Sequence, residues 1–159
     1  MVNQSKKFDE ISNEIKNNFT YCWYFFLEFI FIFTNRWKKQ VGDLEIFSVG
    51  MVIMWHSLVT KSYEANGWNF SKWKKNKIIV PETGVNTMSI SEITHIPRPT
   101  VVRKLNYLLK NKYISVNKKK LFNVNMQDKT LTDTIKLQEK NVLSLSHLIF
   151  KIFGQINIK

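Results

Sequence analysis

The sequence predicts a mainly α-helical protein that carries one small β-hairpin. Its 159 residues include only 5 Gly and 3 Pro, too few for the many tight turns of a β-sandwich or barrel. Apolar residues recur at spacings of three and four over long stretches near both ends, as in amphipathic helices. Two short β-prone runs flank a lysine-rich turn near residue 118. With 44% hydrophobic residues, the chain is expected to fold around a real core.

Residues 1–65 are expected to form an N-terminal helical region with two helices. The first runs from about Phe8 to about Lys39, and aromatic residues on its other faces require cover on more than one side. Gly42 ends it, and Asp43 caps a second helix that runs to about Tyr63. The predicted seam of the first helix is Ile11, Ile15, Phe19, Cys22, Phe26, Phe29 and Phe33. The predicted buried face of the second is Leu44, Phe47, Met51, Met54 and Leu58.

Residues 19–34 are strongly apolar and could be mistaken for a membrane span. A span needs about 20 apolar residues, whereas this stretch is shorter, contains Glu28 and is rich in aromatics. We therefore expect these residues to form a buried helix that does not contact a membrane. A membrane-associated basic helical protein remains the alternative, because the net charge of +12 would also attract anionic lipid.

Residues 66–85 are expected to form a basic, aromatic connecting loop, and residues 126–159 a C-terminal helix from about Asp128 to about Phe153. Two long helices around a compact centre suggest a homodimer, because a centre of about 40 residues cannot cover both apolar faces. The seam of the C-terminal helix is expected to be Leu131, Ile135, Val142, Leu145, Ile149 and Ile152.

Positive charge is concentrated in one quarter of the chain. Residues 86–125 hold eight Lys or Arg against the single acid Glu92, which accounts for +7 of the net +12. A concentration of this kind suits contact with phosphates, because each neutralised phosphate releases condensed counterions. The segment is therefore the candidate nucleic-acid-binding region.

The same segment shows a helix, a tight turn and a second helix. Asn86 can cap a short helix whose predicted buried face is Met88, Ile90 and Ile93. Pro97 and Pro99 fit only the first turn of the next helix, where missing N–H groups cost nothing. In that second helix Val101, Leu105 and Leu108 share one face.

A β-hairpin is expected directly after these helices. Its strands are residues 113–116 and 121–124, and its turn is Asn117 with three lysines. A basic hairpin tip beside a recognition helix would act as a wing.

These features resemble the winged helix-turn-helix of bacterial transcription regulators, broadly of MarR-like architecture, over about 40 residues. The resemblance implies sequence-specific binding of double-stranded DNA and transcriptional regulation by a homodimer. Two positions depart from the family pattern: His95 and Lys112 stand where glycine is common, which carries a cost if the backbone needs a positive φ. The matching positions are Ser89, Ile90, Ser91, Ile96, Thr100, Val101, Arg103, Leu105, Leu108 and Ile114.

DNA contacts are expected from the second helix and the hairpin tip. Arginine suits bidentate contact with guanine in the major groove, whereas the tip lysines would contact the backbone or minor groove. Binding that ignores sequence, as in an architectural or replication protein, stays open as an alternative. The candidate residues are Arg98, Thr100, Arg103, Lys104, Asn106, Tyr107, Lys118, Lys119 and Lys120.

Enzymatic activity is not expected, because no glycine-rich phosphate loop, paired carboxylates or activated nucleophile is evident. His56, His95 and His147 lie far apart, so neither a metal nor another cofactor is predicted. Cys22 is expected to pack in the core, and a single cysteine without a signal-like N-terminus suggests a reducing cytoplasm. A small-molecule effector remains open.

Overall fold

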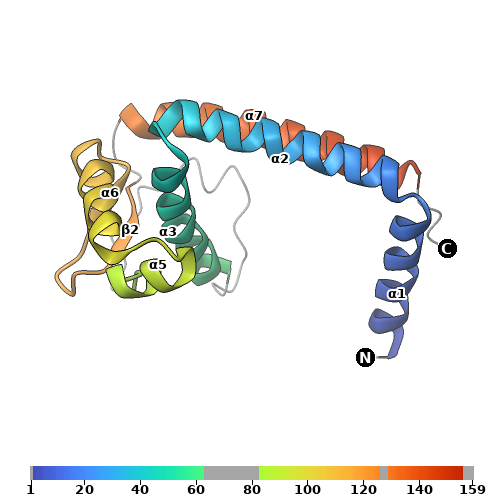
Figure 1. The fold of residues 1–159 in the computed structure, drawn as a ribbon, viewed down its shortest axis with the longest axis horizontal. Coiled ribbons are helices and arrows are strands. Elements are labelled where there is room, and N and C mark those ends of the chain that lie inside the picture. The colour runs from blue at the N-terminus through green and yellow to red at the C-terminus, as the bar shows by residue number, and fades with distance from the viewer. Residues whose placement is uncertain (1, 63–82, 126–128, 156–159) are drawn as a thin grey trace. The chain divides into compact units, whose positions relative to one another are not determined.

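A computed structural model describes residues 2–62, 83–125 and 129–155 of the chain. The described residues are mainly helical and include one two-stranded antiparallel sheet, which confirms this part of the predicted fold class. Residues 66–82 of the expected connecting loop lie outside them. The elements are α1 (Val2–Asn17), α2 (Phe19–Val41), α3 (Leu44–Ser62), α5 (Thr87–Thr94), α6 (Arg98–Lys110), β1 (Ile114–Val116), β2 (Phe122–Val124) and α7 (Lys129–Phe153) (Figure 1).

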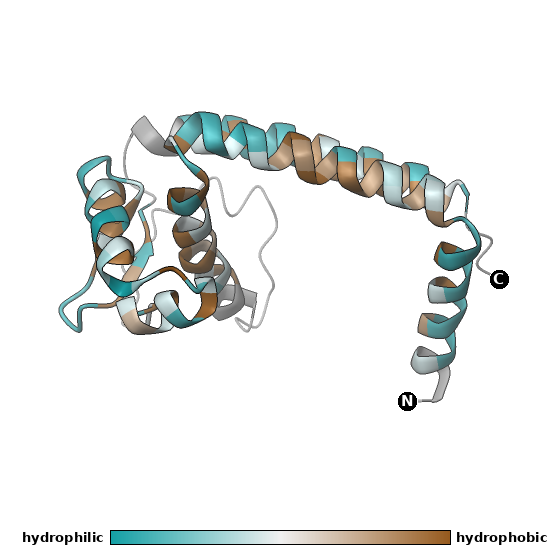
Figure 2. Ribbon diagram, in the orientation of Figure 1, coloured by the Kyte–Doolittle hydropathy of each residue, from teal (hydrophilic) through white to brown (hydrophobic). Residues whose placement is uncertain are grey.

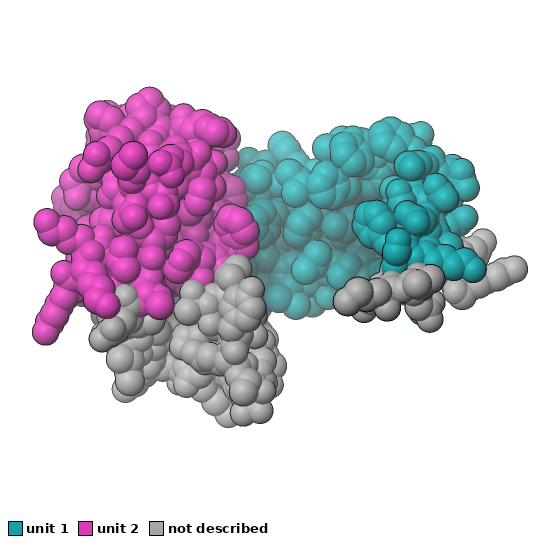
Figure 3. Space-filling view, turned by 90° about the horizontal axis from the view of Figure 1, so that it is seen from below, with its two compact units in different colours: residues 1–36, 137–159 teal, residues 37–136 magenta. Residues whose placement is uncertain are grey.

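The chain divides into two compact units (Figure 3). The terminal unit comprises residues 1–36 and 137–159, and the central unit comprises residues 37–136. Helices α2 and α7 each contribute residues to both units. The candidate DNA-binding segment therefore belongs entirely to the central unit.

The first predicted helix is divided in the terminal unit. A turn at Asn18 separates α1 from α2, so the single helix expected from Phe8 to Lys39 is two helices. The Glu14 carbonyl accepts hydrogen bonds from both the backbone amide and the side chain of Asn18, and side-chain bonds of this kind to the preceding turn bend helices.

Within the terminal unit, α2 and α7 lie side by side and antiparallel. Phe25 contacts His147 edge to face, with ring centroids 6.2 Å apart, while Arg36 bonds to Lys140 at the other end of the contact. One terminal nitrogen of Arg36 donates to the Lys140 carbonyl at 2.9 Å and to the Ser144 hydroxyl at 2.8 Å. These polar bonds specify the register of two otherwise apolar helices.

The predicted seams form this contact only in part. Cys22 is buried and Phe29 lines the space between the helices, but Phe19 and Phe26 are exposed on α2, and Val142, Leu145 and Ile149 are exposed on α7. Both helices are apolar on more than one side, visible as brown in the middle of α2 (Figure 2), so periodicity alone does not define the side that faces the other helix. The outward apolar face of α2 is called the apolar stripe, and it consists of Phe19, Trp23, Leu27 and Ile30. A second apolar face on α7, made of Val142, Leu145, Ile149 and Phe153, points away from α2 and so lies on the opposite side of the helix pair.

A helix that crosses a bilayer needs about 20 predominantly apolar residues. No single helix in the described part of the chain is both long and apolar enough to do so. Helix α2 and residues 44–58 meet the length and composition criterion only when they are counted together across the break at Gly42 and Asp43.

The central unit is built around α3. The Asp43 carboxylate accepts a hydrogen bond from the Ile46 amide at 2.7 Å, which confirms the predicted cap. Helix α3 packs against α5, α6 and β2 through Ile46, Val49 and Ile53. The predicted buried face is wrong at Leu44 and Leu58, which are about half exposed. Because α3 is apolar on nearly all sides, periodicity could not identify its core face.

Helix α5 contacts α3 and α6 through a smaller face than expected. Ile90 is fully buried, but Met88 and Ile93 are 57% and 49% exposed, so their predicted burial is wrong. The half-buried neighbours of Ile90 are Ser91 and Thr94. Their hydroxyls can lie against the core because each donates a hydrogen bond to a backbone carbonyl.

The hairpin follows α6 with the predicted pairing of β1 and β2, in which Ser115 lies opposite Asn123. Val85 forms an additional antiparallel bridge to Phe122, so the chain before α5 is attached to the base of the hairpin. Gly84 lies in this junction. An added Cβ there would lie 2.7 Å from Asn123 Nδ2 and 2.9 Å from the Phe122 carbonyl oxygen.

Gly84→Ala is expected to lower the free energy of unfolding by about 1–3 kcal/mol, because backbone atoms of β2 cannot move away from the new methyl group. Urea unfolding followed by circular dichroism measures this change. Gly50→Ala is the matched control, since its Cβ would lie no closer than 4.0 Å to Leu108 and alanine favours the helix. Equal stabilities of the two variants would contradict the close approach at Gly84.

Candidate nucleic-acid interface

The turn between α5 and α6 is held by side-chain hydrogen bonds. Asn86 caps α5 by accepting a bond from the Ser89 amide at 2.9 Å. Ser91 donates to the Ile96 carbonyl at 2.7 Å, and the Ile96 amide donates to Thr94 Oγ1 at 3.3 Å. These bonds fix the direction in which α6 leaves the turn.

The backbone has a positive φ at both positions where the family pattern commonly has glycine. His95 ends α5 in the left-handed conformation with φ 54°, and Lys112 adopts φ 58° after α6. Glycine would fit both positions without steric cost. Pro99 lies in the first turn of α6, as predicted, whereas Pro97 is the N-cap, one residue before the helix begins at Arg98.

Helix α6 has a buried face and an opposite, solvent-facing face. Val101, Leu105 and Leu108 are at most 2% exposed and fix the helix to the core, as predicted. With about 3.6 residues per turn, the side directly opposite carries Arg103, Asn106 and Lys110, and all three are exposed. Lys110 was not among the predicted contact residues, although its spacing of seven from Arg103 places it on the same side.

The other predicted α6 residues lie around this outer face. Arg98 is exposed at the start of the helix, and Thr100 is half-buried on one flank. Tyr107 is 40% exposed, and its hydroxyl approaches Gly42, about 3.7 Å from where a Cβ would lie. Tyr107 therefore lies on the flank of α6 that faces the start of α3.

Lys104 has a different environment from the other basic residues of α6. Its ammonium lies 2.6 Å from Asp43 Oδ2 and 3.0 Å from Glu45 Oε2, and its side chain is only 12% exposed. The hydrogen bonds that the ammonium donates to these carboxylates raise the pKa of Lys104. A DNA contact would have to break these ion pairs, so we give Lys104 a positioning role between α6 and α3.

The same ion pairs affect Asp43. Partial burial acts to raise its pKa, but the Ile46 amide and Lys104 outweigh this effect and hold the pKa below the ordinary value of 3.8. The stabilisation from Asp43 is therefore present above pH 3.8 and is lost as the pH falls through the lowered pKa. Because the pKa of Lys104 is raised, the stabilisation from its charge is fully present below pH 10.5 and is lost as the pH rises through the raised pKa.

Lys104→Gln is expected to lower the stability by about 1 kcal/mol at pH 7, because two ion pairs at the start of α3 are lost. The difference from the wild type should shrink as the pH falls below 3.8 and through the lowered pKa of Asp43, because protonation of this carboxylate removes its ion pair with Lys104. Thermal unfolding at pH 3 and pH 7 measures it. A difference that is equal at both pH values would show that the charges of this pair do not contribute.

The hairpin tip presents three consecutive lysines. The Asn117 carboxamide oxygen accepts hydrogen bonds from the amides of Lys119 and Leu121, both at 3.0 Å. Lys120 completes the turn with φ 59°. Lys118, Lys119 and Lys120 are exposed, so the tip is a compact cationic surface on an ordered turn.

The base of the hairpin, at the end of the strands away from the tip, is held by hydrogen bonds to other parts of the central unit. The Tyr113 hydroxyl donates to the Gln40 carbonyl at 3.1 Å, and burial raises the pKa of Tyr113. Asn123, which is 2% exposed, donates to the Thr83 carbonyl at 2.8 Å. The tip therefore projects from a fixed base.

The structure thus brings the outer face of α6 and the lysine tip into one folded unit. Figure 2 shows the hairpin loop mainly in the colour of hydrophilic residues. Among the described residues, no group of three or more His, Cys, Asp or Glu side chains could hold a metal ion. Comparisons with models of protein families, with curated proteins and with solved structures found no match.

Proposed function

We propose that this protein binds double-stranded DNA through the central unit as a winged helix-turn-helix transcriptional regulator. The observation that carries the proposal is the outer face of α6, where Arg103, Asn106 and Lys110 point away from a fully buried opposite face. A helix held in this way can enter the major groove without unfolding the core. The order helix, turn, helix and hairpin is compatible with this docking.

The side chains suggest a division of roles. Arg98 and Arg103 offer bidentate donors to guanine, and Asn106 offers the amide pair that suits adenine. Lys118, Lys119 and Lys120 would contact phosphates beside the groove, with Thr100 and Tyr107 as flanking contacts. Lys104 would hold α6 against α3 rather than contact DNA.

We propose further that the regulator acts as a homodimer paired through the apolar stripe. The two aromatic rings of the stripe, Phe19 and Trp23, together present roughly 200 Å² if each fully exposed ring presents about 200 Å². A stable interface needs about 800 Å² from each partner, so pairing would also bury the aliphatic side chains of the stripe and exposed apolar side chains that flank it. A second copy of the chain supplies an identical apolar surface, and two-fold pairing would give a binding site with inverted repeats.

Selection of sites from a pool of random duplexes, at about physiological salt, tests the function. Enrichment of an inverted repeat is expected. Retention without enrichment would mean that the protein binds only the DNA backbone, as an architectural or replication protein does. Absence of retention would contradict DNA binding, and co-sedimentation with anionic vesicles would then test the membrane alternative.

Arg103→Ala is expected to cost about 1–3 kcal/mol of binding free energy on a selected site and to relax the sequence preference at one base pair. Fluorescence anisotropy with the selected duplex and a scrambled duplex measures both effects. Lys136→Gln is the control, because Lys136 is exposed on α7 and its replacement also removes one positive charge. Arg36 does not serve this purpose, because its side chain bonds to α7. Unchanged affinity of Arg103→Ala would show that another surface meets the DNA.

A further inference from the structure

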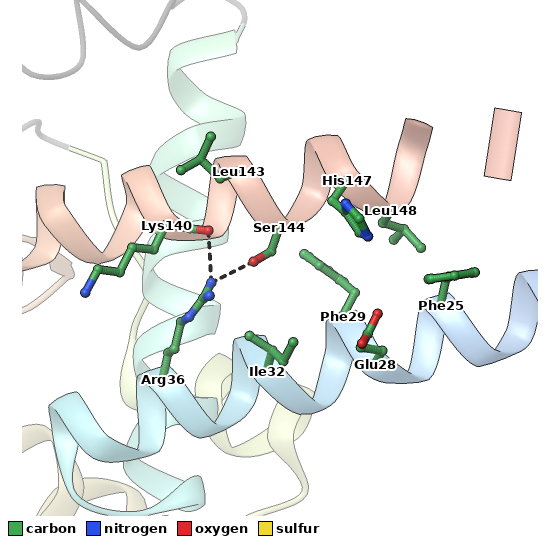
Figure 4. A pocket seen from close by; sticks show the side chains of 10 residues that line it. All are labelled: Phe25, Glu28, Phe29, Ile32, Arg36, Lys140, Leu143, Ser144, His147 and Leu148. Carbon is green, nitrogen blue, oxygen red and sulfur yellow. Dashed lines mark hydrogen bonds between the residues drawn. The ribbon is translucent and has the colours of Figure 1, made fainter. Parts of the chain in front are cut away.

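A cavity of about 370 Å³ lies between α2 and α7 in the terminal unit (Figure 4). Its volume is within the range of sites that bind small organic molecules. Phe29 and Ile32 from α2 and Leu148 from α7 form its apolar walls. An elongated apolar body could therefore lie along the two helices.

One end of the cavity is cationic. Arg36 is fixed there by the hydrogen bonds of a single terminal nitrogen to Lys140 and Ser144. The other N–H groups of its guanidinium have no hydrogen-bond partner among the described residues. Lys140 also lines the cavity, and its ammonium forms no ion pair with any of these residues, but Figure 4 shows the ammonium extending away from Arg36, so it would have to change rotamer to reach the same ligand. The guanidinium N–H groups of Arg36 suit a carboxylate.

The other end carries the opposite charge. Glu28 lies eight residues before Arg36, about 12 Å away along α2, and Figure 4 shows Ile32 and Phe29 between them. Glu28 is half-buried, and its carboxylate has no hydrogen bond or ion pair within the described parts of the chain. A partly buried carboxylate without a partner carries a desolvation cost that a cationic ligand would remove.

We propose that this cavity binds a small bipolar molecule with an elongated apolar body, a carboxylate at one end and an ammonium at the other. The carboxylate would meet Arg36 and Lys140, and the ammonium would meet Glu28. A purely anionic ligand would leave Glu28 unpaired, and a purely cationic one would leave Lys140 unpaired.

The site does not compete with the proposed pairing of two copies. Glu28 and Ile32 lie on a different side of α2 from Trp23 and Ile30 of the apolar stripe, as the helical repeat requires. The cavity also belongs wholly to the terminal unit. Ligand binding can therefore be measured without DNA, and its failure would leave the proposed DNA binding unaffected.

Isothermal titration calorimetry of the full chain with three matched probes tests the proposal. The bipolar probe is 4′-(aminomethyl)biphenyl-4-carboxylate, and its single-charge counterparts are biphenyl-4-carboxylate and 4-(aminomethyl)biphenyl. The bipolar probe is expected to bind about tenfold more tightly than either counterpart, as one additional charge-assisted hydrogen bond predicts. Equal binding of all three probes, or no binding of the bipolar probe, would overturn the proposal.

Two substitutions assign the ends of the ligand, and neither removes an interaction that supports the fold. Glu28→Gln should lower the affinity for the bipolar probe about tenfold and leave biphenyl-4-carboxylate unchanged. Lys140→Gln should weaken the binding of both probes that carry a carboxylate. Arg36 should stay in place in this variant, because it bonds to the backbone carbonyl of Lys140 and not to the side chain. Lys136→Gln, on the same helix but outside the cavity, should change nothing. Glutamine variants that bind like the wild type would place the probe elsewhere.

Discussion

Replacing the three tip lysines by glutamine is expected to flatten the salt dependence of DNA binding. Each phosphate contact contributes about 0.9 to the slope of log affinity against log salt, so Lys118, Lys119 and Lys120 together contribute about 2.7. Between 50 and 200 mM salt, the wild-type affinity should therefore fall about fortyfold more than that of the triple variant. Anisotropy titrations on one selected duplex at four salt concentrations measure the slope.

The control for this prediction removes the same charge from another surface. Lys6, Lys7 and Lys16 are exposed on α1, in the terminal unit, and their replacement by glutamine also lowers the net charge by three. This variant should keep the wild-type slope within experimental error. If both triple variants lose the same slope, the +12 charge acts as a diffuse field and the hairpin tip has no special role.

Leu27→Glu is expected to separate the homodimer into single chains. Leu27 is 52% exposed on the apolar stripe, and in a paired structure its carboxylate would be buried without a partner at the interface. Two such charges, one from each copy, would face the same desolvated contact. Size-exclusion chromatography with light scattering should give two chains for the wild type and one for the variant at micromolar concentration.

Phe8→Glu is the matched control for Leu27→Glu. Phe8 is 70% exposed on α1 and lies outside the apolar stripe, so the same change there should leave the mass unchanged. Far-ultraviolet circular dichroism should show full helical content in both variants, because neither residue lies in the buried core. A wild-type protein that elutes as a single chain would contradict the dimer before any variant is made.

The local structure of the central unit could be predicted from sequence because its signals are short-range. Asn86 caps a helix through its own carboxamide, Pro99 allows only a first-turn position, and the spacing of Val101, Leu105 and Leu108 fixes one face. Each signal depends on neighbours within one or two helical turns. The proposed α6 contacts follow from that face by helical geometry alone.

Features that depend on partners distant in the sequence could not be predicted in the same way. Lys104 looks like any other basic residue of α6, and only the fold brings it to Asp43, 61 residues earlier. The sequence pattern also defines the core face of α3 and the α7-facing side of α2 only in part, because both helices are apolar on several sides. The two adjacent asparagines, Asn17 and Asn18, are too weak a sequence signal for the helix break at Asn18, because the apolar spacing continues from Ile15 to Phe19 across them.

Three residues of the central unit adopt the left-handed backbone conformation although they are not glycine, and two of them carry a positive charge. His95, Lys112 and Lys120 each hold a positive φ that costs a side-chain-bearing residue about 1–2 kcal/mol and glycine very little. A chain with glycine at these joints would be easier to fold, but it would lose two cations beside the helix and hairpin. The central unit is therefore less stable at the positions where these side chains add positive charge. A variant with glycine at these positions should unfold at a higher temperature and bind anions more weakly.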